Sequence, residues 1–183
     1  MAQRKLTYKK SDNKKQVREF LFSLFANKQL NKIVGLAGPD IDDYLQFCKS
    51  KGYEEFEIYE NHFPTAVEQI RKLRTHGRVN IRFGDILQAN PDNDRVLFDL
   101  DYCATVRTLK EHISKFDNNF IMTFSRRVAN TIETFFSSRN ETIIKSVECD
   151  SPVQHTVFTT KHGKYVYVPY RDTSSMCCIA KIN

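Results

Sequence analysis

The sequence lacks any long apolar run. No stretch of 18 consecutive apolar residues occurs in it, which is the length a membrane-spanning helix requires. The N-terminal region also lacks the apolar core and small-residue cleavage site of a signal peptide, because a long basic stretch leads into an amphipathic segment at residues 17–25. We therefore expect a cytoplasmic protein that does not span a membrane.

Cysteine and histidine patterns typical of disulfide frameworks and metal sites are also missing. The five cysteines are odd in number and show no CxxC spacing, and the five histidines form no HxH or HExxH pair. Cys177 and Cys178 stand in an apolar run, which favours buried thiols acting as small hydrophobic groups. We expect no metal and no disulfide framework.

The positive charge of the chain is concentrated at one end. Residues 1–18 hold seven cations and one acid, a net charge of +6, which equals the net charge of all 183 residues. A basic arm on a neutral body is typical of contact with phosphate backbones, and a solvated tail that aids solubility explains the pattern equally well. We expect residues 1–15 to form a basic arm and 16–183 a single domain. The cations proposed to bind nucleic acid are Arg4, Lys5, Lys9, Lys10, Lys14, Lys15 and Arg18.

Apolar spacing along the chain predicts strands that alternate with helices. Such alternation indicates a parallel sheet with helices on both faces, and the last residues alternate like antiparallel strands. The predicted fold is a doubly wound α/β domain with a mainly parallel sheet and an antiparallel C-terminal hairpin. Helices are expected at 16–27, 41–51, 64–73, 106–116 and 128–137, and strands at 31–35, 56–59, 78–83, 95–99, 119–124, 154–160, 165–168 and 175–182.

A turn or an acid that suits ligand binding follows each of the first four expected strands. The first strand leads into the small-residue turn 35–40 (GLAGPD), whose backbone N–H groups a ligand can approach. Glu60 ends the second strand and can accept both hydroxyls of a ribose. Asp85 and Ile86 follow the third, where the acid can accept an adenine amino proton and Ile86 can pack on the ring. Asp99 ends the fourth, and ligands of open α/β sheets bind beyond such carboxyl ends.

In this order the four features resemble the motifs of the class I S-adenosylmethionine (SAM)-dependent methyltransferases. The turn 34–38 (VGLAG) is similar to the glycine-rich motif I, 83–86 (FGDI) to the adenine-contacting motif, and 99–102 (DLDY) to motif IV. The stretch 170–181 resembles the antiparallel strands that end this fold. The likeness covers residues 30–183, whereas the turn at 35–38 does not match the GxGxxG spacing of a dinucleotide-binding dehydrogenase.

The resemblance implies SAM as the cofactor. Gly35 stands where the family usually has an acid and Ala37 where it has the first loop glycine, and Asp40 can compensate for the missing acid electrostatically. The residues implied to bind the cofactor are Gly35, Ala37, Gly38, Asp40, Glu60, Asp85, Ile86 and Asp99.

Motif IV supplies the candidate catalytic residues Asp99, Asp101 and Tyr102. An exocyclic amine that attacks a SAM methyl group needs in-line positioning and acceptors that orient its N–H bonds. The two acids can provide such acceptors, and Tyr102 can stack on a base. The alternative, purely structural roles are helix capping by Asp99 and packing by Tyr102. The motif lacks the proline of Asp-Pro-Pro-Tyr, and three of its residues match the Asp-Leu-Asp-Pro of tRNA guanine-N2 methyltransferases.

The predicted function is SAM-dependent methylation of a base amine of nucleic acid, RNA or DNA, with the basic arm holding the backbone. A single-stranded or flipped-out base suits such a pocket, because the acceptor atom must enter it. The alternative is a catalytically inactive methyltransferase-fold protein that serves as a binding or structural module. A methyltransferase for proteins or small molecules is a third possibility, but it leaves the arm without a role.

Overall fold

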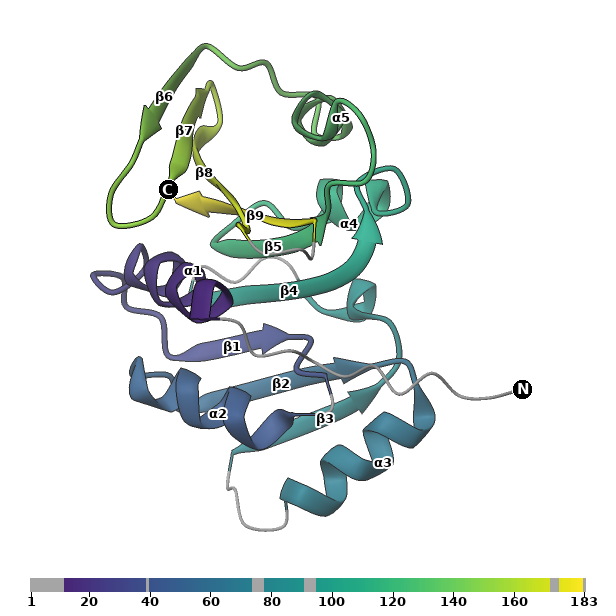
Figure 1. Cartoon of the computed structure of the whole chain (residues 1–183). Coiled ribbons are helices and arrows are strands. Elements are labelled where there is room, and N and C mark those ends of the chain that lie inside the picture. The colour runs from purple at the N-terminus through teal and green to yellow at the C-terminus, as the bar shows by residue number, and fades with distance from the viewer. Residues whose placement is uncertain (1–11, 39, 74–77, 91–94, 172–174, 183) are drawn as a thin grey trace.

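The computed structural model describes residues 12–38, 40–73, 78–90, 95–171 and 175–182, which form an α/β domain around one sheet. Its nine strands lie in the order β3-β2-β1-β4-β5-β9-β8-β7-β6. The first five strands are parallel, and β9 then runs antiparallel to β5. In Figure 1 the arrowheads of β1, β2 and β4 accordingly point the same way and that of β9 points back.

The parallel half of the sheet matches the predicted alternation. Its strands are β1 (Lys32–Gly35), β2 (Glu55–Glu60), β3 (Val79–Phe83), β4 (Val96–Thr105) and β5 (Phe120–Ser125). The helices are α1 (Asp12–Ser23), α2 (Ile41–Ser50), α3 (Phe63–Lys72), α4 (Lys110–Lys115) and α5 (Thr131–Ser138), with a short 3-10 helix η2 (Ile86–Gln88). The predicted boundary of the basic arm at residue 15 falls inside α1, so residues 12–15 are helical.

The C-terminal part is more extensive than the expected hairpin. It contains β6 (Lys145–Cys149), β7 (His155–Thr160), β8 (Gly163–Pro169) and β9 (Met176–Ile182), all paired antiparallel. The sheet is therefore mixed rather than mainly parallel. The edge strand β6 was not predicted, because four of its five residues are exposed and it has no buried face to produce an alternating pattern.

Two apolar cores lie on opposite faces of the sheet. Side chains alternate along a strand, so Leu97 of β4 belongs to one core and its neighbour Phe98 to the other. The core that contains Leu97 is closed by the buried faces of α1 and α2, and the core that contains Phe98 by η2, α4 and α5. No helix among the described residues has the length and apolar character that crossing a membrane requires.

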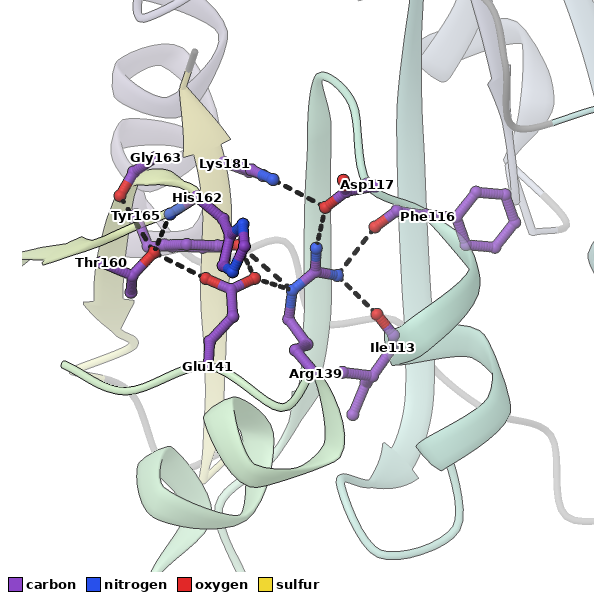
Figure 2. Close-up of polar contacts among 10 residues, drawn as sticks. All are labelled: Ile113, Phe116, Asp117, Arg139, Glu141, Thr160, His162, Gly163, Tyr165 and Lys181. Carbon is purple, nitrogen blue, oxygen red and sulfur yellow. Dashed lines mark hydrogen bonds and ion pairs between the residues drawn. The ribbon is translucent and has the colours of Figure 1, made fainter.

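A buried polar network ties the antiparallel strands to the parallel half (Figure 2). At its centre the guanidinium of Arg139, just after α5, donates to Glu141 (2.9 Å) and to the hydroxyl of Tyr165 on β8 (3.1 Å). It also donates to the carbonyl oxygens of Ile113 and Phe116 at the end of α4. The side chains of Arg139 and Glu141 are each only 3% exposed, so this is a buried ion pair.

Further hydrogen bonds hold the carboxylates of this network in the ionised form. Glu141 accepts from Thr160 at 2.7 Å and from Tyr165 at 2.5 Å, and Lys181 donates to Asp117 at 2.6 Å. Burial acts to raise the pKa of Glu141, but these donors and Arg139 outweigh it, and the pKa lies below its usual value. The same balance, with Lys181 and Arg139 as partners, lowers the pKa of Asp117.

Removing the central cation should destabilise the fold strongly. We expect Arg139→Met to lower the free energy of unfolding by about 3–5 kcal/mol in urea titrations, because Glu141 is left as an uncompensated buried charge. The control is Arg71→Met on α3, where an exposed side chain is changed and an effect within about 0.5 kcal/mol is expected. Equal stability of the two variants would contradict a structural role for the network.

Candidate functional site

The candidate site lies at the edge of the sheet where the parallel strands end. Gly35, the last residue of β1, pairs with Ile58 of β2 on one side and with Asp99 of β4 on the other. The order of the strands reverses here, because β2 and β3 extend in one direction and β4 and β5 in the other. Open α/β sheets bind ligands beyond the strand ends at such a switch point.

Gly35 allows an unusually close approach between β1 and β4. A Cβ atom at this position would lie 2.4 Å from the carbonyl oxygen of Asp99 and 3.2 Å from the hydroxyl oxygen of Tyr44. The same carbonyl oxygen accepts a hydrogen bond from the N–H of Leu36 at 3.0 Å. Glycine is therefore required by packing at the position where the sequence predicts a cofactor-binding turn.

The turn after Gly35 is held by Gln69 of α3, which leaves one buried polar atom unused. Gly38 adopts a φ of +64°, and its carbonyl oxygen accepts from Nε2 of Gln69 at 2.6 Å. The other amide atom, Oε1 of Gln69, is buried without a hydrogen-bond partner among the described residues. A buried polar atom without a partner is costly, so Oε1 of Gln69 suits a polar ligand at this turn. The buried hydroxyl of Tyr44 on α2 instead faces the carboxylate of Asp99.

Three predicted acids surround the same edge. Asp40 precedes α2 and is exposed, and its side chain makes no capping hydrogen bond to the helix. Glu60 ends β2, and its Oε1 accepts from the N–H of His62 at 2.8 Å. Asp85 caps η2 by accepting from the N–H of Leu87 at 2.9 Å. The N–H of Gly84, the residue before Asp85, donates to the carbonyl oxygen of Glu60, so the backbones at these two strand ends lie side by side.

Two other residues of the predicted cofactor site point away from solvent. Ile86 is 2% exposed and belongs to the core that contains Phe98, so its side chain packs beneath the strand ends rather than beside an open pocket. Ala37 is partly buried against the opposite core. Both contribute to the shape of the turns.

Asp99 of the predicted catalytic motif is bound by a residue of the predicted basic arm. Arg18 on α1 donates to Oδ2 of Asp99 at 2.8 Å, and the carboxylate is almost fully buried. The guanidinium carbon of Arg18 also lies 4.8 Å from the ring centroid of Tyr44 and 5.1 Å from that of Phe47. These two rings hold the positively charged guanidinium of Arg18 against the end of β1 and the middle of β4.

Burial and the ion pair act in opposite directions on both groups. Burial raises the pKa of Asp99 above its usual value, although Arg18 acts to lower it. Burial acts to lower the pKa of Arg18, but Asp99, Tyr44, Cys48 and Asp101 together outweigh it and raise the pKa, so the guanidinium stays charged. Burial also raises the pKa of Tyr44 well above its usual value, which keeps its hydroxyl protonated as a hydrogen-bond donor.

Asp101 is the more accessible acid of the motif. Lys14 lies 3.5 Å from its Oδ2, and the carboxylate side chain is 20% exposed, compared with 5% for Asp99. A hollow of only about 20 Å³ lies between α1 and the sheet. This volume holds about one water molecule. Because Asp101 is the more exposed of the two acids, a substrate group reaches it more readily than it reaches Asp99. The hollow is lined by Lys14, Arg18, Leu21, Phe22, Asp99, Asp101, Ile121, Thr123, Tyr170 and Cys178.

Tyr102 lies on the other face of β4 from the two acids, because successive side chains alternate. It is 9% exposed, and its hydroxyl is 2.7 Å from Nδ1 of His112 on α4. This favours the packing interpretation of Tyr102 over stacking on a substrate base.

The cations of the predicted arm separate into different groups. Lys14 and Arg18 form ion pairs with Asp101 and Asp99, and Lys15 is exposed on α1. Arg4, Lys5, Lys9 and Lys10 lie outside the described residues. Sequence reasoning missed the pairing of Arg18 with Asp99 because the two residues are 81 positions apart. It also missed Tyr44 and Gln69, because neither stands in a motif.

Comparison with known proteins identifies the fold. No family model and no curated protein sequence matches the chain. Among solved structures, a SAM-dependent methyltransferase from Leishmania major is 13% identical, with a TM-score of 0.55 over 92% of this chain and 70% of that one. The m1A22 tRNA methyltransferase of B. subtilis is 10% identical, with a TM-score of 0.51 over 88% and 65%. Geranyl diphosphate methyltransferase, solved in complex with SAM, is 11% identical, with a TM-score of 0.51 over 74% and 67%.

The chain thus has the fold of the class I SAM-dependent methyltransferases, as the motifs led us to expect. It spans about two thirds of the length of most of the solved structures that it matches.

The Arg18–Asp99 pair gives a pH-dependent test. Arg18→Met should lower the free energy of unfolding at pH 7 by about 3–5 kcal/mol, and the double variant Arg18→Met/Asp99→Asn should recover most of this loss, because no buried charge remains.

In the single variant the pKa of Asp99 is raised by burial without an opposing cation, so the folded state binds a proton that the unfolded state releases. Its stability should therefore rise as the pH is lowered from about 8 to about 5, relative to the parent, in urea titrations at each pH. If the difference in the free energy of unfolding between the variant and the parent stays constant across this pH range, Asp99 is already neutral in the parent.

Proposed function

We propose that this protein is a SAM-dependent methyltransferase that acts on a base amine of nucleic acid. The observation that supports it most directly is the turn 35–40 at the switch point of the sheet. Gln69 presents a buried amide oxygen there that has no hydrogen-bond partner among the described residues. Likeness to methyltransferases over most of the chain supports the same choice.

The residues around this turn suit the parts of SAM. At Gly38 no atom lies within 4 Å of the position that a Cβ would take, so a ligand can approach the backbone there, and Oε1 of Gln69 can accept. Glu60 retains Oε2 for ribose hydroxyls while its Oε1 accepts from His62. Asp85, one strand further along, would then accept from the adenine amino group, as the resemblance to the family implies.

SAM, when bound, supplies a methyl group on a positively charged sulfur, so the protein has mainly to position the acceptor. Asp101 is the acid best placed to accept the N–H bonds of an incoming amine, because it is accessible and close to the end of β1. Asp99 would act through the local field rather than by touching the substrate, since Arg18 occupies its carboxylate. Lys14 would have to leave Asp101 when the amine binds.

Nucleic acid is the proposed substrate because of the charge of residues 1–18 and because one similar structure is a tRNA methyltransferase. We therefore propose RNA, rather than DNA, as the substrate. Phosphate contacts by the arm would position the strand without reading its sequence.

A specific contact also favours the alternative of an inactive binding module. The carboxylate of Asp99, which matches the first residue of motif IV, accepts from Arg18 at Oδ2 and lies beside a hollow large enough for about one water. In that case the protein would bind SAM or nucleic acid without transferring a methyl group.

Cofactor binding is tested by calorimetry with SAM and S-adenosylhomocysteine. Glu60→Ala and Asp85→Ala should each weaken binding by about 1.5–3 kcal/mol, the scale of a hydrogen bond to a charged group. The matched control is Glu54→Ala, an exposed acid before β2 that pairs with Arg78, and it should bind SAM as the parent does. Unchanged SAM affinity in both site variants would show that SAM does not bind at this pocket.

Catalysis is tested by incorporation of tritiated methyl groups into mixed RNA and DNA. Asp101→Asn should leave SAM affinity within a few-fold and reduce methyl transfer by roughly a hundredfold, comparable to the loss of one positioned electrostatic contact. Asp150→Asn, an exposed acid after β6, serves as the control and should retain the parent rate. A parent protein that binds SAM but labels neither polymer would favour the binding module.

A further inference from the structure

Charge is divided along the carboxyl edge of the sheet. The half formed by the ends of β1, β2 and β3 carries acids, with Asp40, Glu60 and Asp85 each just after or at the end of a strand. The half formed by β4, β5 and β8 carries arginines after its strand ends, beside the acids Asp99 and Asp101 within β4. Residues 102–109 after motif IV and 125–131 after β5 contain no acid at all.

We define the arginine rim as Arg107, Arg126, Arg127 and Arg171. Arg107 follows the end of β4 by two residues, Arg126 and Arg127 follow β5 directly, and Arg171 follows the end of β8 by two residues. All four are exposed. They were not singled out by the sequence, because Arg107, the pair Arg126–Arg127 and Arg171 stand in three separate segments of the chain.

Strand pairing places the rim along one continuous edge. Thr105 of β4 pairs with Ser125 of β5, which in turn pairs with Met176 of β9, and Cys177 of β9 pairs with Pro169 of β8. The rim therefore extends across three strand spacings, about 14 Å at roughly 4.8 Å for each step. This part of the edge lies on the far side of β4 from β1, β2 and β3 (Figure 1).

Two members of the rim are anchored, and none is neutralised by a described acid. Arg126 donates to the carbonyl oxygen of Tyr170 at 3.1 Å, and Arg171 donates to Oε1 of Gln154 at 3.2 Å. Neither acceptor is charged, so no partner offsets the positive charge of these two guanidinium groups. Each group also has further N–H donors that an anion can use. No ion pair joins Arg107 or Arg127 to another described residue.

The rim adjoins the proposed acceptor position. Tyr170, whose carbonyl oxygen holds Arg126, lines the small hollow together with Asp101 and Lys14. The backbone N–H of Arg171 donates to Asn13 in the first turn of α1, next to Lys14. An anion held on the rim would thus lie beside Asp101 and away from the acids of the cofactor half.

We propose that the arginine rim binds the phosphodiester backbone of single-stranded RNA and leads one base toward Asp101. This rests on the proposed function and adds to it the surface that holds the substrate. Arginine suits the task because its planar fork of donors matches phosphate oxygens. The division of charge steers a polyanion to one half of the edge, and a single strand can turn one base into the site. The cations of the rim are available, whereas Arg18 and Lys14 of the arm are paired with Asp99 and Asp101.

The test compares two double variants that each remove two exposed cations. Arg107→Gln/Arg127→Gln changes the rim without breaking any side-chain hydrogen bond that holds the described fold. Arg71→Gln/Lys161→Gln changes α3 and the β7–β8 turn and is the matched control. Binding of a fluorescent oligouridylate of about 20 nucleotides is measured by anisotropy between roughly 50 and 300 mM salt.

The rim variant should bind at least about tenfold more weakly at low salt, and the slope of log K against log salt should flatten by about 1.4, because two contacts at about 0.7 each are lost. The control should stay within about twofold of the parent with the same slope. Tighter binding of oligothymidylate than of oligouridylate would overturn the assignment to RNA. Polyglutamate that competes with oligouridylate as well as unlabelled RNA does would overturn it in favour of an acidic protein.

SAM calorimetry on the same samples separates this proposal from the proposed function. If the parent binds SAM and the rim variant binds RNA as the parent does, the rim is wrong and the methyltransferase function stands. If the parent binds no SAM but the rim variant alone loses RNA binding, the surface is supported and the methyltransferase function fails.

Discussion

The contact between Gly35 and the backbone of Asp99 determines how the whole carboxyl edge is arranged. Because the carbonyl oxygen of Asp99 takes the space that a Cβ of residue 35 would need, β1 and β4 stay in register up to the last residue of β1. That register brings the Asp99 carboxylate beneath α1, where Arg18 binds it, and sets Gly35 against Tyr44. The end of β1, the acid of β4 and α1 are thus positioned by one close backbone approach.

The parallel half of the fold could be predicted from the sequence because its signals are local. Buried strands such as 120–125 read as short apolar runs, and amphipathic helices such as 41–50 show a regular apolar spacing. The antiparallel extension gave weaker signals, since β6 has no buried face and β4 continues past Asp99 through the half-buried segment 101–105. Pairing with a neighbouring strand, rather than its own composition, extends β4.

The positions of strand-end residues could be predicted from the sequence, whereas contacts between distant residues could not. The backbone of Gly84, the neighbour of Asp85, bonds to that of Glu60 because parallel strands end at one edge. Arg18 and Asp99 are 81 residues apart, and the basic run around Arg18 made a phosphate contact the simpler interpretation. Tyr102 stands beside two acids in the sequence, and alternation along β4 puts its side chain on the opposite face of the strand, which favours packing over stacking on a base.

Two arginines that pair with buried carboxylates, Arg139 and Arg18, join parts of the fold that are far apart in the sequence. Arg139 fastens the antiparallel strands to α4, and Arg18 fastens α1, an amphipathic helix at the start of the described chain, to the middle of β4. A hydrophobic face tolerates sliding, whereas a buried guanidinium requires one particular carboxylate and leaves a large penalty when misplaced. Because Arg18 selects Asp99, the position of α1 is coupled to motif IV, and any substrate that engages Asp101 must first compete with the first turn of α1.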